Sequence, residues 1–330
     1  RGFYSDNGAT AVEVALKMAF QYWRHVGQPR RTRFVHLEGS YHGDTLGAVS
    51  VGGIDLFHAA FRPLLFESIG APHPHPLRPP CGEPPERCVE GCLAKTRRIF
   101  EEHGLEIAAL VVEPRVLGAA GIHVSPPSYL KALRAICDEH GVLLIADEVA
   151  TGFGRTGPMW AVDSAGVTPD LLCLAKGISG GYLPLAATLA TEEVYGAFLA
   201  PYEAMRTFFH GHTYTGNPLA CAAGIASLDL FEKENVLQRS EGRIARLGER
   251  LKGVAAHPRV AEVRQCGFLV GIELAPPTSS QYPWEERRGV RACLAARDKS
   301  VLLRPLGNVV VLNPPLSISD EEIDRLVDAA

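Results

Sequence analysis

The stretch from Leu171 to Thr191 contains a single charged side chain, Lys176, in the sequence LLCLAKGISGGYLPLAATLAT. Three glycines and a proline interrupt it, so it cannot form an unbroken membrane-spanning helix. We expect a strand over Leu171–Leu174, a glycine loop that carries the lysine, and a second strand over Leu185–Ala190. This arrangement puts Lys176 at the carboxyl end of a strand, where open α/β sheets bind their ligands.

Lys176 has two interpretations at this point. A lone ammonium among apolar residues is costly unless it is paired or loses its proton. A neutral, desolvated amine is the form that reacts with carbonyl groups. The alternative is a core strand whose final lysine extends its ammonium to the surface. The chain has seven lysines, and the other six lie near carboxylates, arginines or polar helix faces.

Composition limits the class of protein. The 330 residues suggest about two domains, and 46% hydrophobic with 21% charged residues is ordinary for a soluble globular chain. The net charge of −4 without a basic stripe argues against a nucleic-acid partner. No signal peptide or membrane-spanning run is found, which predicts a cytoplasmic protein. The chain begins at Arg1, inside an expected strand over Gly2–Ser5, so we expect an N-terminal segment of the full protein to be missing.

Apolar segments of two kinds alternate along the first two thirds of the chain. Near-continuous apolar runs predict buried strands joined by helices, which is an α/β layered fold. The expected strands are Arg33–Leu37, Ile107–Val112 and Val142–Ala146, and the expected helices are Ala11–Trp23, Leu93–His103 and Pro126–His140. Residues 71–87 are rich in proline and predict a loop.

The pattern changes after Asn217. Longer helices and short strands then predict a smaller C-terminal α+β domain, so we divide the chain into residues 1–225 and 226–330. The expected helices are Leu219–Lys233, Asn235–Val254 with Asn235 as its N-cap, Glu285–Lys299 and Ser319–Ala330. The expected short strands are Val260–Leu274, Val301–Arg304 and Val309–Leu312.

Two features near strand ends suggest ligand binding. Asp6 to Thr10 leads into a helix with a glycine and small residues, so its N–H groups can bind a phosphate; a plain N-cap by Asn7 or Thr10 is the alternative. Asp147 follows a buried strand, where it can serve a site, cap a loop or pair with Arg155.

Further candidates are aromatic or metal-ligating residues. Tyr41 in a glycine-containing loop can stack on a flat ligand or pack on the core. His210 and His212 have the spacing of metal ligands but no third ligand of typical spacing nearby. Cys81, Cys88 and Cys92 lie close in sequence to His73 and His75. This segment is either a surface loop or a zinc site.

Taken together, the lysine, the carboxylate, the phosphate-binding turn and the aromatic ring predict pyridoxal phosphate chemistry. Lys176 would form a Schiff base with the cofactor aldehyde, and Asp147 would hold the proton on the pyridine nitrogen.

The motifs LLIADEVATGFGRTG and PDLLCLAKGISGGYLPLAATLAT also resemble the class III aminotransferases of the fold-type I pyridoxal phosphate enzymes. The resemblance covers nearly the whole chain. It implies a large domain with a mostly parallel central sheet, a smaller C-terminal α+β domain, and a homodimer with active sites at the subunit interface.

Three stretches, FYSDNGATAVEVALKMAFQYW, TFFHGHTYTGNPLACAA and LLRPLGNVVVLNPP, resemble the members of the family that act in biotin synthesis. This resemblance implies S-adenosylmethionine as the amino donor and 8-amino-7-oxononanoate as the acceptor, which becomes 7,8-diaminononanoate. The alternatives are another class III ω-amino acid aminotransferase or an aminomutase, and a catalytically silent truncated relative.

The same resemblance implies roles for single residues. Lys176 binds the cofactor and moves the proton, and Asp147 pairs with the pyridine nitrogen. Gly8 and Ala9 bind the phosphate, together with the partner subunit's His212 and Thr213. Tyr41 contacts both the cofactor and the substrate. Gly211 and Arg304 also bind the substrate. Arg155 shapes the site or has a structural role.

The sequence departs from the family pattern at three positions. Val311 lies near a position that is often tyrosine, Ala9 replaces a frequent serine, and His212 stands where some relatives have proline. The backbone N–H of residue 9 is retained, but a hydroxyl contact to the phosphate is lost.

Overall fold

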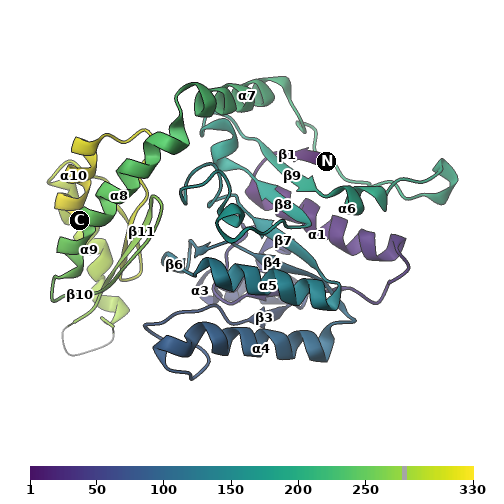
Figure 1. Cartoon of the computed structure of the whole chain (residues 1–330), viewed down its shortest axis with the longest axis horizontal. Coiled ribbons are helices and arrows are strands. Elements are labelled where there is room, and N and C mark those ends of the chain that lie inside the picture. The colour runs from purple at the N-terminus through teal and green to yellow at the C-terminus, as the bar shows by residue number, and fades with distance from the viewer. Residues whose placement is uncertain (277–280) are drawn as a thin grey trace.

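The structure is a computed structural model that describes residues 1–276 and 281–330. Two principal β-sheets organise it, one of seven strands and one of four (Figure 1). The smaller sheet and its helices, coloured green to yellow, lie to one side of the larger sheet, and α7 (Pro218–Lys233) leads across to them. Within the described residues, no helix is long and apolar enough to cross a membrane.

The seven-stranded sheet forms the centre of the larger part. Its strands are β1 (Gly2–Ser5), β2 (Arg33–Leu37), β3 (Ile69–Ala71), β4 (Ile107–Val112), β7 (Leu143–Asp147), β8 (Leu171–Leu174) and β9 (Ala186–Ala190). Their order across the sheet is β1-β9-β8-β7-β4-β2-β3. The strands β3, β2, β4, β7 and β8 run parallel, and β9 is antiparallel to both its neighbours. The expected mostly parallel α/β sheet is confirmed.

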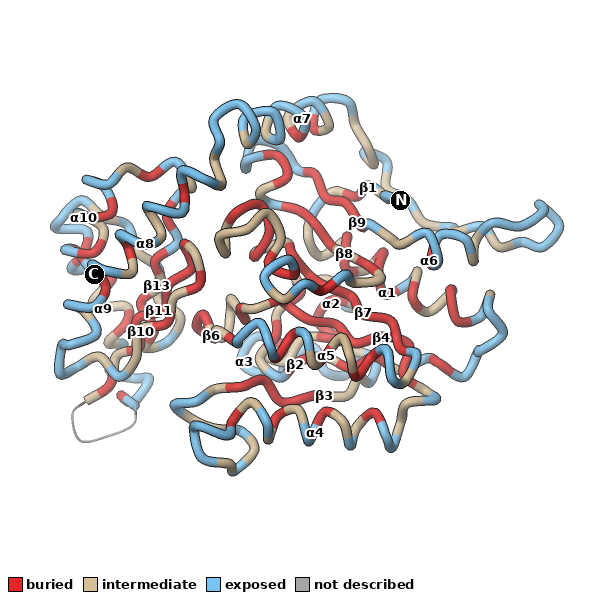
Figure 2. The backbone as a smooth tube through the Cα atoms, in the orientation of Figure 1, coloured by how far each residue is buried: buried red, intermediate tan, exposed pale blue. Residues whose placement is uncertain are grey.

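Helices cover both faces of this sheet. The helix α1 (Gly8–His25) packs on one face, and α4 (Cys88–His103) and α5 (Pro127–His140) pack on the other. Alternate residues of a strand point to opposite faces, so Ile145 packs with α1 while Leu144 packs with α4 and α5. The strands are therefore buried on both sides, as their colour in Figure 2 shows, and their sequences are continuously apolar.

Short elements lie between the longer helices and strands of both parts. They are α2 (Leu46–Ser50), α3 (Asp55–His58), α6 (Glu192–Gly196), the strand pair β5 (Val116–Leu117) and β6 (His123–Val124), and 3₁₀ turns at Ala59–Leu64, Pro85–Arg87, Ala161–Ala165, Lys176–Ser179, Tyr202–Ala204 and Trp284–Glu286.

The smaller sheet is antiparallel, in the order β10-β11-β13-β12. Its elements are β10 (Val260–Cys266), β11 (Leu269–Leu274), β12 (Arg304–Leu306), β13 (Val309–Leu312), α8 (Val236–Ala255), α9 (Arg288–Arg297) and α10 (Asp320–Ala329). Phe268, Val270 and Leu312 form a separate core with these helices. The expected C-terminal α+β part is confirmed. The division after residue 225 falls inside the continuous helix α7 and stays a prediction.

Several expected elements differ in the structure. The strand expected over Val301–Arg304 is wrong, because β12 only begins at Arg304. Its partner β13 is followed by Pro314 and Pro315, and proline has no N–H with which to extend the ladder. Asn235 precedes α8, but its side chain makes no capping hydrogen bond. The sequence did not predict β3, α2 or α3.

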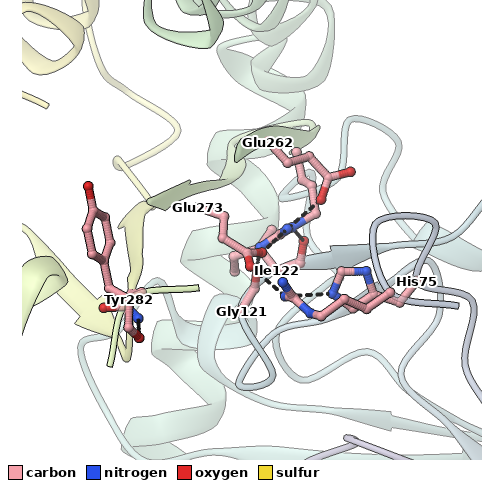
Figure 3. Close-up of polar contacts among 9 residues, drawn as sticks. His75, Gly121, Ile122, Glu262, Glu273 and Tyr282 are labelled. Atoms are coloured by element: carbon pink, nitrogen blue, oxygen red, sulfur yellow. Dashed lines mark hydrogen bonds and ion pairs between the residues drawn. The ribbon is translucent and has the colours of Figure 1, made fainter. Parts of the chain in front are cut away.

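A buried arginine joins the two parts (Figure 3). Arg264 of β10 donates to the carbonyl oxygens of Gly121 (2.8 Å) and Ile122 (3.2 Å), in the loop between β5 and β6. It also lies 2.6 Å from a carboxylate oxygen of Glu262 and 2.6 Å from one of Glu273. Since a buried guanidinium requires such partners, this network fixes the smaller sheet against the β5–β6 loop.

Candidate active site

A cavity of about 1660 Å³ opens at the carboxyl ends of the parallel strands. Its walls come from the start of α1, from the loops after β2, β4, β7 and β8, and from β12 and β13. Six of the residues predicted from the sequence line it, namely Gly8, Ala9, Tyr41, Asp147, Lys176 and Arg304. Residues far apart in the chain therefore meet at the edge of the sheet where ligand binding was expected.

Asp147 is the last residue of β7 and is only 4% exposed. Its Oδ2 lies 2.7 Å from Nδ1 of His42, and its Oδ1 accepts the N–H of Val149 at 3.0 Å. His42 is buried, and among the described residues its Nε2 has no hydrogen-bond partner. The imidazole therefore fixes the orientation of the carboxylate, a contact that the sequence did not predict.

Glu113 is a further buried carboxyl group in the cavity wall, directly after β4. Its two oxygens accept the N–H groups of Tyr41 (2.9 Å) and Gly118 (3.1 Å). Burial raises the pKa of Glu113 to about 7 from 4.5, and the nearby Asp147 charge acts in the same direction. Glu113 thus holds the Tyr41 loop in place. The sequence analysis did not single out Glu113, although, like Asp147, it follows a buried strand.

Lys176 follows β8 and begins a 3₁₀ turn in the left-handed region, with φ of 45°. The close packing of Gly177 supports this turn, since a β-carbon there would lie 2.7 Å from Cβ of Phe153. The lysine side chain is exposed towards the cavity, and no hydrogen bond or ion pair holds its ammonium within residues 1–276 and 281–330. The single chain does not provide the apolar enclosure that the sequence suggested.

The turn before α1 has the features of an anion site. Asn7 and Thr10 form a capping box, as the simpler interpretation of the sequence expected. The N–H groups of Gly8 and Ala9, however, have no acceptor in the part of the chain that the structure describes. A β-carbon on Gly8 would lie 2.6 Å from Cγ1 of Val149. The turn thus combines free donors with a position that requires glycine.

Tyr41 and Arg304 both line the cavity, one from each part of the chain. The Tyr41 hydroxyl donates to Oδ2 of Asp44 at 2.8 Å. Burial, reinforced by this hydrogen bond, raises the pKa of Tyr41 to about 12, and the Arg304 charge opposes the shift. Arg304 is exposed and makes no ion pair with any described residue, which leaves its guanidinium available to a ligand.

Three predicted residues do not line the cavity of this chain: Gly211, His212 and Thr213. They lie on the segment that precedes α7, where Lys17 Nζ is 2.9 Å from Nδ1 of His210. Nδ1 of His212 lies 2.7 Å from Oδ2 of Asp6, within ion-pair distance but without hydrogen-bond geometry.

Other candidates have structural surroundings. Arg155 is partly buried and donates to the carbonyl oxygen of Pro314, so its contact is with the backbone and not with Asp147. Val311 also lines the cavity, and the resemblance implied a frequent tyrosine near this position. Among the described residues, no group of three or more His, Cys, Asp or Glu side chains is arranged to hold a metal ion.

The donor set fits pyridoxal phosphate. The free N–H groups of Gly8 and Ala9 suit a phosphate, the buried Asp147 suits a protonated pyridine nitrogen, and the amine of Lys176 suits an aldehyde. The fold and this set of residues define the class of a pyridoxal-phosphate-dependent enzyme.

Comparisons with known proteins narrow this class. The sequence model "Aminotransferase class-III" matches residues 1–330, and the chain belongs to this pyridoxal-phosphate-dependent family. It is 57% identical over 99% of its length to adenosylmethionine-8-amino-7-oxononanoate aminotransferase of Geobacter sulfurreducens, of which it covers 73%.

Two solved structures are similar along the whole chain. The crystal structure of the adenosylmethionine-8-amino-7-oxononanoate aminotransferase from Methanocaldococcus jannaschii has a TM-score of 0.92 at 42% identity and covers 100% of this chain and 74% of that one. An amine transaminase from an uncultivated Pseudomonas species, solved in its PLP-bound form, has a TM-score of 0.93 at 40% identity and covers 100% and 75%.

Proposed function

We propose that the protein transfers an amino group from S-adenosylmethionine to 8-amino-7-oxononanoate, which gives 7,8-diaminononanoate for biotin synthesis. The observation that carries this proposal is the 57% identity over 99% of the chain to a relative named for these two substrates. A free arginine in the cavity adds to it, because 8-amino-7-oxononanoate has a carboxylate that a guanidinium can bind through two parallel hydrogen bonds.

The residues of the cavity divide the chemical work. When bound, pyridoxal phosphate supplies a pyridine ring that accepts electrons from the amino-bearing carbon of the substrate. Asp147, oriented by Nδ1 of His42, holds the proton on the ring nitrogen. Lys176 Nζ takes the proton from the amino-bearing carbon and returns a proton in the second half of the reaction. Gly8 and Ala9 hold the phosphate with their N–H groups.

A specific alternative is another class III transaminase that uses simple amines or amino acids. The similarity to the amine transaminase, with its TM-score of 0.93, supports this alternative. A panel of amino donors separates the two, with 8-amino-7-oxononanoate as the acceptor. Activity with S-adenosylmethionine supports our proposal, and activity with common amines but none with S-adenosylmethionine rules it out.

A catalytically silent relative is the remaining alternative. The purified wild-type protein should absorb visible light through its bound cofactor, and Lys176→Ala should shift that absorbance. A wild-type protein that takes up no cofactor at saturating pyridoxal phosphate would support the silent alternative.

We further propose a homodimer in which each chain completes the site of its partner. Large apolar side chains are exposed on α7 and on the segment before it, including Leu219 (75%), Ile225 (63%), Tyr214 (73%) and Phe209 (72%). Figure 2 draws most of α7 as exposed or intermediate, with little buried surface. A contiguous apolar face of this kind is typical of a protein interface. In such a dimer, the partner subunit would also enclose Lys176 more than the single chain does.

Mixing two inactive variants tests this arrangement. Lys176→Ala removes the amine of its own site, and Thr213→Asp places a negative charge against the phosphate that Thr213 contacts. If Thr213 acts on the partner's site, a mixed dimer has one intact site, and remixing should restore about a quarter of wild-type activity. If Thr213 acts within its own chain, the mixture stays inactive. A monomer in sedimentation velocity would contradict the proposal directly.

A further inference from the structure

Three of the eight cysteines meet where the proline-rich loop of residues 72–87 packs on α4. Sγ of Cys81, in the loop, lies 3.4 Å from Sγ of Cys92, on the helix. Cys88, one turn earlier on α4, accepts the N–H of His75 at 3.3 Å. The sequence suggested a surface loop or a zinc site here, whereas the structure shows a close pair of thiols with a third beside it.

The approach of Cys81 to α4 depends on Gly91. A β-carbon at residue 91 would lie 3.2 Å from Cβ of Cys81 and 2.6 Å from Cγ of Glu83. Lys95 Nζ, on the next turn of α4, is 3.5 Å from the carbonyl oxygen of Pro80. The loop is thus packed tightly on the helix where the two sulfur atoms meet.

The two thiols differ in their access to solvent. Cys81 is partly exposed, whereas Cys92 is fully buried and Cys88 is 1% exposed. Burial, together with the hydrogen bond to Cys81, raises the pKa of the Cys92 thiol. Cys92 therefore stays protonated inside the protein, and a dissolved oxidant reaches Cys81 first.

We propose that Cys81 and Cys92 form a redox-active pair. Cys81 is the thiol that hydrogen peroxide oxidises, and Cys92 is the resolving thiol that then forms the disulfide. The Cys81 thiolate attacks one oxygen of hydrogen peroxide, and the O–O bond breaks. That oxygen stays on the sulfur as a sulfenic acid, and the other oxygen leaves as water after it takes up a proton. The Cys92 sulfur then attacks the Cys81 sulfur, the S–O bond breaks, and the hydroxyl leaves as a second water with the Cys92 proton. Two thiols and one peroxide thus give one disulfide and two waters.

The disulfide would fasten a loop that contacts the smaller sheet. Arg78, three residues before Cys81, lies 2.5 Å from Oε1 of Glu273 and donates to Nε2 of His75 at 3.1 Å. Figure 3 shows His75 and Glu273 in the network that joins the two parts. Because a closed loop loses entropy in the unfolded state, oxidation should raise the melting temperature by about 2–4 °C.

Thiol mapping of the holoenzyme tests the proposal. The reduced protein is treated with hydrogen peroxide, blocked with N-ethylmaleimide, unfolded, digested and analysed by mass spectrometry. We expect a Cys81–Cys92 cross-linked peptide that dithiothreitol cleaves, with the other six cysteines blocked as free thiols. No thiol loss, or a cross-link through Cys88, would overturn the assignment. An oxidised enzyme with unchanged melting temperature would overturn the proposed fastening of the loop.

Variants separate the pair from general oxidation. Cys81→Ser should form no disulfide. In Cys92→Ser, the sulfenic acid of Cys81 should accumulate, and dimedone should label it. Gly91→Ala should slow disulfide formation at least several-fold, because the added methyl group displaces Cys81. Gly242→Ala is the matched control, since a β-carbon there meets nothing within 4 Å. Equal oxidation rates in Gly91→Ala and Gly242→Ala would contradict the close approach that the structure shows.

Discussion

The pH dependence of stability should report directly on Glu113. Its carboxyl group is buried and has a pKa of about 7, against 4.5 for the free side chain. Because the folded-state value is the higher one, the folded protein binds the proton more tightly than the unfolded chain. The stability that this group contributes is therefore fully present below pH 4.5 and is lost as the pH rises through about 7.

Proton linkage gives the magnitude. Between pH 5.5 and 8.5, a shift of this size removes about 2 kcal/mol of stability. Glu113→Gln cannot ionise, so this loss should disappear. Its amide has one acceptor for the N–H groups of Tyr41 and Gly118, which costs about 1–3 kcal/mol at every pH. The difference in unfolding free energy between Glu113→Gln and the wild type should therefore change with pH.

Thermal melting at saturating cofactor measures this difference. An unfolding entropy of about 0.7 kcal/mol/K for a chain of this length converts 2 kcal/mol into about 3 °C. From pH 5.5 to 8.5, the melting temperature of the wild type should fall by about 3 °C more than that of Glu113→Gln. Glu148, whose pKa burial also raises to about 7, is present in both proteins and cancels. Glu101→Gln, at an exposed position of α4, should follow the wild type. Parallel curves for Glu113→Gln and the wild type would refute the reasoning.

Three further predictions concern the cavity. Asp147→Asn should still bind pyridoxal phosphate, as absorbance will show, but its turnover should fall about 10- to 150-fold because the charge-assisted contact is lost. Unchanged turnover would contradict the role of Asp147. Arg304→Ala should raise the KM for the keto substrate about 10- to 150-fold more than that for the amino donor, with partial recovery in Arg304→Lys, whereas equal effects on both substrates would argue against carboxylate binding. Gly8→Ala should weaken cofactor binding about 5- to 150-fold in titrations because its methyl group overlaps Val149, and Gly8→Ala with Val149→Ala should recover part of it; wild-type affinity in the single variant would contradict the tight turn.

The sequence predicted the parts of the fold that have a local signal. The strands Ile107–Val112 and Leu171–Leu174 agree with the structure to the residue, since strands buried on both faces require uninterrupted apolar runs. The positions of Asp147 and Lys176 at strand ends were predicted for the same reason. Asp147 comes directly after an apolar run, and Lys176 comes two residues after one. The strand over Val301–Arg304 was wrong because β12 begins only at Arg304, opposite Val311, and the prolines that follow β13 have no N–H groups to extend the ladder.

The contacts around these residues could not be predicted in the same way. The hydrogen bond from His42 to Asp147 joins residues 105 positions apart, and that from Tyr41 to Glu113 joins residues 72 positions apart. No local pattern encodes such pairs, which arise when parallel strands bring their ends to one edge of the sheet. The meeting of Cys81 with Cys92 likewise depends on how a proline-rich loop folds back on its helix.

Steady-state kinetics with S-adenosylmethionine and 8-amino-7-oxononanoate test the central proposal most directly. The holoenzyme should form 7,8-diaminononanoate, detected by mass spectrometry, and Lys176→Ala should form none above background. Product formed by Lys176→Ala at the wild-type rate, or no product from a wild-type protein that has bound its cofactor, would contradict the account.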